Sequence, residues 1–136
     1  MRNINKIIIH CSATPEGKAF SVEDIRRWHL QRRFADIGYH FVIYLDGSVN
    51  VGRPLAKAGA HCKGYNAHSI GVCYIGGVAT DGKTPKDTRT EAQKRSLVRL
   101  ITELRQQFPN ASVHGHREFA NKACPSFNAR DEYKDL

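Results

Sequence analysis

The sequence of 136 residues lacks any apolar run that approaches the roughly 20 residues of a membrane-spanning helix. It also lacks a secretory signal, because residues 1–6 are polar and lead straight into a β-branched segment without an apolar core or a small-residue cleavage site. Internal repeats and low-complexity tracts are absent as well. We therefore expect a single domain over residues 1–136 that is made in the cytoplasm and makes no contact with a membrane.

Cysteine is scarce, and no two of the four cysteines form a CxxC pair. An even number could form disulfides, but a chain without an export signal favours free thiols or metal ligands. The run 69–75 is apolar and rich in β-branched residues, so Cys73 within it is expected to be a core residue. The other three thiols are Cys11, Cys62 and Cys124.

Acidic residues are also few, 13 against 21 lysines and arginines, which gives a formal net charge of +8. Such a charge attracts polyanions, and charge alone does not separate nucleic acid from an anionic cell wall. One possible function is therefore that of a basic regulatory binding protein. The sequence contains no recognised nucleic-acid motif, which argues against nucleic acid as the partner. We interpret one group of arginines as the solvated surface of a helix, namely Arg26, Arg27, Arg32 and Arg33.

Periodicity predicts helices and strands along the whole chain. The best-supported helix spans residues 91–107, where a capping box at Thr90 precedes apolar residues at helical spacing. A second helix is expected over residues 22–32 after Ser21, and a short third one within residues 128–136. The expected strands are 7–10, 39–44, 49–51, 69–75 and 111–114, with Asp46-Gly47 as a hairpin turn.

Potential metal ligands gather in the stretch 113–127, which contains His114, His116 and Cys124. Zinc prefers imidazole and thiolate among its ligands, and a site takes three or four protein ligands. His10 closes the strand 7–10, and open α/β sheets place ligands beyond the carboxyl ends of their strands. We therefore hypothesise a zinc bound by His10, one of the two late histidines, and Cys124. The alternative is an ordinary strand-end histidine and a buried thiol.

Two further segments could line a cleft. Tyr39 opens the expected strand 39–44, and its hydroxyl either pairs in a half-buried environment or reaches the metal pocket. Residues 53–66 form a loop that includes His61, Tyr65 and Asn66, and binding residues concentrate on loops. An ordinary surface connection is the alternative for this loop.

Six short motifs occur in order over nearly the whole chain: IHCSAT (9–14), GYHF (38–41), HCKGYN (61–66), SIGV (69–72), GHRE (115–118) and KACPSF (122–127). In these motifs the chain resembles the zinc N-acetylmuramoyl-L-alanine amidases of the peptidoglycan-recognition-protein fold, and the small phage lysozyme-type amidases in particular. The resemblance implies a single α/β domain with a central mixed β-sheet flanked by helices.

The resemblance also implies which side chains bind metal. It assigns the zinc to His10, His116 and Cys124, and so prefers His116 over His114. Three protein ligands leave one coordination position open, which is typical of a catalytic zinc site. Non-catalytic relatives typically lose the ligating cysteine, so the presence of Cys124 favours hydrolysis over mere binding.

For catalysis and substrate binding, the resemblance implies two groups of residues. Tyr39 and Lys122 are the expected catalytic residues, and His61, Tyr65 and Asn66 are expected to bind substrate. His61 is also a candidate, beside Tyr39 and Lys122, for the group that protonates the leaving amine.

The implied function is hydrolysis of the amide bond between N-acetylmuramic acid and L-alanine in peptidoglycan. We expect a monomer that acts on the cell wall after release or delivery, as a phage or prophage lysin would. The alternatives are a non-catalytic peptidoglycan-binding module and the basic regulatory binding protein considered above.

Overall fold

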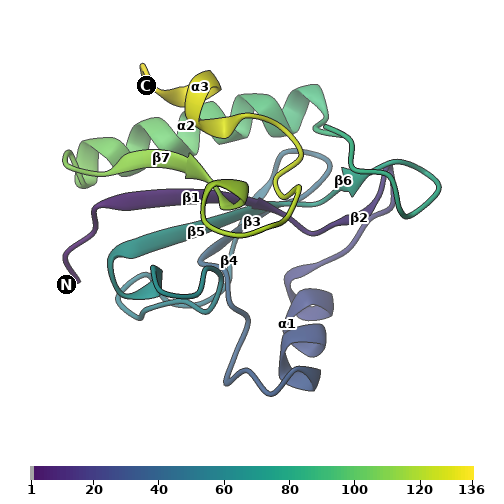
Figure 1. Cartoon of the computed structure of the whole chain (residues 1–136), viewed down its shortest axis with the longest axis horizontal. Coiled ribbons are helices and arrows are strands. Elements are labelled where there is room, and N and C mark those ends of the chain that lie inside the picture. Colours follow the sequence, from purple (N-terminus) through teal and green to yellow (C-terminus); the bar gives the residue numbers. More distant parts are fainter. Residues whose placement is uncertain (1) are drawn as a thin grey trace.

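A five-stranded sheet with the order β4-β3-β5-β1-β7 forms the centre of the molecule (Figure 1). The computed structural model describes residues 2–136. The four strands from β3 to β7 in this order run parallel, and β4 pairs antiparallel with β3. The strands are β1 (Lys6–Cys11), β3 (Phe41–Ile43), β4 (Val49–Val51), β5 (Ser69–Tyr74) and β7 (Ser112–Gly115). The expected mixed sheet is confirmed.

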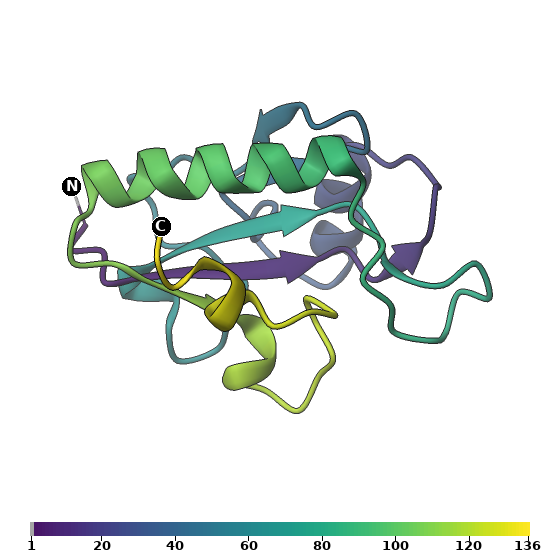
Figure 2. The same cartoon turned by 90° about the horizontal axis from the view of Figure 1, so that it is seen from above.

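Helices cover both faces of this sheet. Helices α2 (Glu91–Gln107) and α3 (Ala129–Tyr133) lie on one face, and α1 (Val22–Gln31) lies on the other (Figure 1). Figure 2 looks onto the sheet from the α2 side, where α2 extends along β5 and β1. Capping boxes at Ser21 and Thr90 satisfy free backbone N–H groups in the first turns of α1 and α2.

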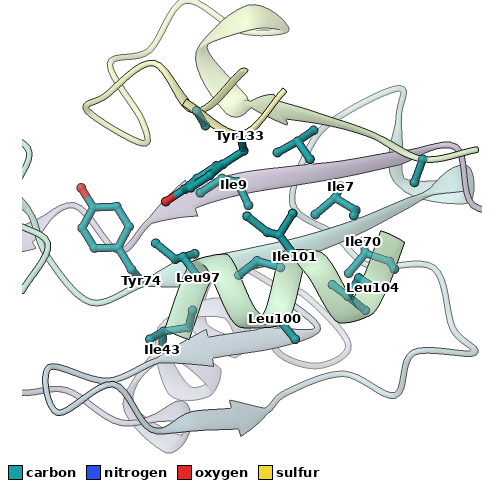
Figure 3. Packing of buried hydrophobic residues seen from close by; sticks show 14 of the residues in the cluster. Ile7, Ile9, Ile43, Ile70, Tyr74, Leu97, Leu100, Ile101, Leu104 and Tyr133 are labelled. Carbon is teal, nitrogen blue, oxygen red and sulfur yellow. The ribbon is translucent and has the colours of Figure 1, made fainter. Parts of the chain in front are cut away.

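The larger core lies between the sheet and α2 (Figure 3). Ile7 and Ile9 of β1 pack there against the apolar stripe of α2, which includes Leu97 and Ile101. Successive side chains of a strand point to opposite faces, so His10 points to the α1 face of the sheet. His10 is thus held near the end of a central strand in which every residue after Lys6 is buried.

Several predicted boundaries agree closely with the structure. Helix α2 has the bounds predicted for it, α1 ends one residue earlier than expected, and β7 is shifted by one residue. The prediction of a strand over 39–44 was wrong at its start, because Tyr39 and His40 precede β3. All four cysteines are free thiols, and Cys73 is fully buried as expected.

Four short elements were not predicted. Strands β2 (Thr14–Pro15) and β6 (Gly77–Val78) pair with each other outside the main sheet. Single 3₁₀ turns form η1 (Asn66–His68) and η2 (His116–Glu118). Among the helices of residues 2–136, none has both the length and the apolar composition needed to cross a bilayer.

Candidate active site

Three potential metal ligands meet at the carboxyl edge of the sheet. His10, His116 and Cys124 each offer a ligand atom, and these atoms all lie within 4.8 Å of one another. His10 comes from β1, and His116 follows directly after β7, the strand that pairs with β1. The Nδ1 atom of His10 lies 3.8 Å from Sγ of Cys124, and the rings of His10 and His116 are 4.5 Å apart.

Hydrogen bonds hold the loop that carries Cys124 against the sheet. The backbone N–H of Cys11 donates to Sγ of Cys124 at 3.2 Å, and the N–H of Arg117 donates to the Cys124 carbonyl at 2.8 Å. The hydroxyl of buried Tyr74 donates to the carbonyl of Pro125 at 2.7 Å. Cys124 and Pro125 are therefore tied to three separate elements, β1, β5 and η2.

The chemistry of the three side chains suits a metal cation. Burial, followed by the neighbouring His61 and His116, lowers the pKa of His10 well below its usual value, so this imidazole is neutral. Burial and Lys122 lower the pKa of His116. A hydrogen bond with Cys11, together with burial, raises the pKa of the Cys124 thiol, so a thiolate there needs a cation beside it. Neutral imidazoles and a thiol at these separations are a donor set that fits zinc.

A cleft of about 500 Å³ opens beside this cluster on the α1 face. His116 lies in its wall, so the cluster is reached from the cleft. The other lining residues come from α1, the segment 32–39 that follows it, the loop 53–66 and the segment after β7, and include His29, Arg32, Phe34, Tyr39, His61, Lys63, Asn66, Phe119 and Lys122. Arg32, which directly follows α1, is exposed as expected and also lines the cleft.

Both residues expected to be catalytic face this cleft. The Tyr39 ring lies 5.0 Å from the His10 ring. Burial, with nearby Cys73 and Cys124, raises the pKa of Tyr39 well above its usual value, so its hydroxyl keeps its proton and can donate a hydrogen bond. Lys122 is exposed, and its positive charge contributes to lowering the pKa values of His10 and His116.

The three residues expected to bind substrate are placed differently from one another. His61 is 8% exposed, and its Nδ1 atom lies 2.9 Å from Nε2 of His10. Asn66 lines the cleft while its Oδ1 atom accepts hydrogen bonds from the N–H groups of His61 and Cys62. Tyr65 is not among the residues that line the cleft, and its ring packs 4.3 Å from that of Phe119, which does line it.

His114 lies outside the ligand cluster. Its Nδ1 atom is 2.9 Å from Oε1 of Glu118, and its Nε2 atom is 2.7 Å from the Ser112 hydroxyl. Glu118 also accepts a hydrogen bond from the N–H of Gly115, so it shapes the turn into η2. Of the two late histidines, it is therefore His116 that the structure brings to His10 and Cys124.

The profile of the N-acetylmuramoyl-L-alanine amidase family matches residues 1–127 of this chain. The chain belongs to this family. An endolysin of Klebsiella phage KP32 is 42% identical over 126 residues, which cover 93% of this chain and 83% of that protein. An endolysin of Escherichia phage T7 is 44% identical over 124 residues, which cover 91% of this chain and 82% of that protein.

Solved structures agree with the assignment. The amidase LysC from Clostridium intestinale URNW superposes with a TM-score of 0.82 at 28% identity, covering 96% of this chain and 82% of that one. This amidase is thus a hydrolase of the bond between N-acetylmuramic acid and L-alanine, on a single α/β domain. The fold, the family and the activity implied by the motifs are confirmed.

Proposed function

We propose that this amidase is zinc-dependent and that His10, His116 and Cys124 hold the ion. The observation that carries the proposal is the convergence of these three side chains, from three separate segments, beside the cleft, with His116 in its wall. Two neutral imidazoles and a thiol that meet at one point are typical of a zinc site. When bound, zinc supplies Lewis acidity to the scissile carbonyl and to the attacking water.

The remaining chemistry falls to Tyr39 and Lys122, which face the same cleft. The carbonyl oxygen gains negative charge as water adds to the amide, and the Tyr39 hydroxyl and the Lys122 ammonium are hydrogen-bond donors in the lining of the cleft beside the cluster. Loss of one such donor typically lowers the rate by about 10²–10³. Because the pKa of Tyr39 is raised by burial, Lys122 is the better source of the proton for the leaving nitrogen.

The substrate is peptidoglycan, and we propose that the protein reaches it at the cell wall as a monomer. Support for the wall comes from the phage relatives, which are named endolysins. Support for a monomer comes from the surface of the described residues, where only two of the exposed large apolar side chains, Val49 and Val51, share an element, the short strand β4. The exposed large apolar side chains are Leu30, Val49, Val51, Tyr65 and Val98.

The test compares three variants for zinc content and for hydrolysis of purified peptidoglycan. Hydrolysis is followed by the appearance of free amino groups on alanine, since cleavage of a glycan bond would instead release reducing ends. We expect Cys124→Ser and His116→Asn to lose bound zinc and hydrolysis while remaining folded. His114→Asn is the matched control, and it should keep both. Full hydrolysis by Cys124→Ser would refute the zinc assignment.

A further inference from the structure

The two ring nitrogens of His10 face different partners. Nδ1 points to the ligand cluster, 3.8 Å from Sγ of Cys124. Nε2 points away from the cluster and lies 2.9 Å from Nδ1 of His61. The rings of His10 and His61 are nearly perpendicular, at 88°, so the edge of one ring meets the other. The His10 atom that can bind a metal in the cluster is therefore Nδ1.

The other nitrogen of His61 is also engaged inside the protein. Its Nε2 atom lies 3.2 Å from the hydroxyl of Ser69, a residue that is fully buried in β5. Both ring nitrogens of His61 are thus directed at protein groups, which leaves neither for the substrate. This argues against the expected role of His61 in substrate binding and in protonating the leaving amine.

The fold provides a fitted place for the His61 ring. A Cβ atom added at Gly71 of β5 would lie 2.7 Å from the His61 ring, and one added at Gly59 would also lie 2.7 Å from it. Real Cβ atoms do not approach so closely, so these two glycines leave the space that the ring occupies. The Oδ1 atom of Asn66 accepts a hydrogen bond from the backbone N–H of His61 at 2.9 Å. The ring position is therefore determined from several sides.

The contacts from His10 through His61 to Ser69 allow His10 to bind a metal through Nδ1 in only one arrangement of the protons. A His10 that offers the Nδ1 lone pair carries its proton on Nε2, and this N–H then donates to Nδ1 of His61. His61 in turn carries its proton on Nε2 and donates to the hydroxyl oxygen of Ser69. A metal-bound histidine commonly donates its second N–H to such an acceptor, which sets both the ring orientation and the tautomer.

We propose that His61 is a positioning residue for His10: it accepts the Nε2 proton and thereby presents Nδ1 to the zinc, with Ser69 fixing the tautomer of His61. This inference rests on the proposed zinc site. Without the acceptor, the His10 ring loses a buried hydrogen bond and the preference for the tautomer that binds metal. Loss of a contact of this kind lowers metal affinity by about 10–100-fold.

The test uses two substitutions of nearly equal size at one position. His61→Asn places an amide oxygen where Nδ1 stands and keeps an acceptor, whereas His61→Leu has a similar shape and no acceptor. Zinc affinity is measured by competition with a chromogenic chelator, and the absorption spectrum of the cobalt-loaded protein reports the ligand geometry. His68→Leu is the matched control, because His68 is exposed on η1 and bonds to the Asn3 carbonyl, away from the cluster.

We expect His61→Leu to weaken zinc binding about 10–100-fold, with His61→Asn and His68→Leu within about threefold of the parent. The cobalt spectrum of the Leu variant should keep the thiolate charge-transfer band and change in its ligand-field bands. Unfolding in chelator shows that each variant is folded. Should His61→Leu not fold, Ser69→Ala replaces it, and we expect this variant to bind zinc several-fold more weakly.

Two results would overturn the inference. The first is a parental zinc affinity in His61→Leu, or in Ser69→Ala where it replaces the Leu variant. The second is an equal loss of zinc affinity in His61→Leu and His61→Asn, which would mean that only the shape of the side chain matters. Failure of the zinc site itself looks different. In that case the parent protein binds no stoichiometric zinc, or Cys124→Ser remains active. A zinc-binding parent, an inactive Cys124→Ser variant and an unaffected His61→Leu variant would reject the role of His61 alone.

Discussion

Tyr74 ties the loop of Cys124 to the sheet, and removal of its hydroxyl should both destabilise the fold and weaken metal binding at the proposed zinc site. Tyr74 is fully buried at the end of β5, near Leu97 of α2 (Figure 3). Its hydroxyl donates to the carbonyl of Pro125, the residue after Cys124, at 2.7 Å. Tyr74→Phe deletes this one oxygen and keeps the ring, so the packing of the core is retained.

The size of the effect follows from the buried acceptor that the substitution leaves behind. Removal of one partner from a buried hydrogen bond costs about 1–3 kcal/mol, because the Pro125 carbonyl then has no donor. In a chain of this length, a loss of that size lowers the Tm by roughly 4–12 °C. The Cys124 loop also loses one of its ties, so the entropy of ordering that loop is added to the cost of binding zinc.

The assay is thermal unfolding in chelator and again with saturating zinc, together with zinc affinity by competition. We expect a lower Tm in chelator and a weaker affinity for Tyr74→Phe. Tyr65→Phe is the control, since Tyr65 is partly exposed and outside the core. If Tyr74→Phe unfolds at the parental temperature and binds zinc equally well, the hydroxyl does not hold the loop and the reasoning fails.

Two further predictions concern catalysis and acid stability. Tyr39→Phe should lower kcat by about 10²–10³ with zinc content unchanged, and a parental kcat would remove Tyr39 from the mechanism. Burial lowers the pKa of His40 from 6.5 to about 4, so the unfolded chain binds more protons in this range. The free energy of unfolding, measured in chelator, should therefore fall by up to about 3 kcal/mol from this group as the pH drops from 6.5 to 4. His40→Asn should show a shallower decline, and an identical pH dependence in the two proteins would contradict the assignment.

Local pattern was sufficient for much of the fold. The bounds of α2 follow from the capping box at Thr90 and the helical spacing that continues to Leu104, and both signals lie within one segment. Strand β1 was recognised because three successive isoleucines are rare outside a buried strand. By contrast, β2 and β6 are two residues each, and their pairing depends on two segments more than 60 residues apart that carry no repeating pattern.

The sequence predicted which residues form the candidate site, but it did not predict the contacts between them. Residue chemistry and motif order pointed to His10, His116 and Cys124 before any geometry was available. The contact of His61 with His10 could not be read from spacing, because it depends on the parallel pairing of β1 with β5 and on the missing side chain of Gly71. The place of Arg32 in the cleft wall likewise depends on how α1 sits against the sheet.

The separation of the proposed ligands along the chain has a consequence for biosynthesis. His10 and Cys124 are 114 positions apart, and β1 lies between β5 and β7, strands that the ribosome makes much later. A nascent chain that stops short of Cys124 therefore contains His10 without its companions and without a complete sheet around it. If Cys124 is a ligand as proposed, the ability to cut the wall would arise only when translation has passed this residue.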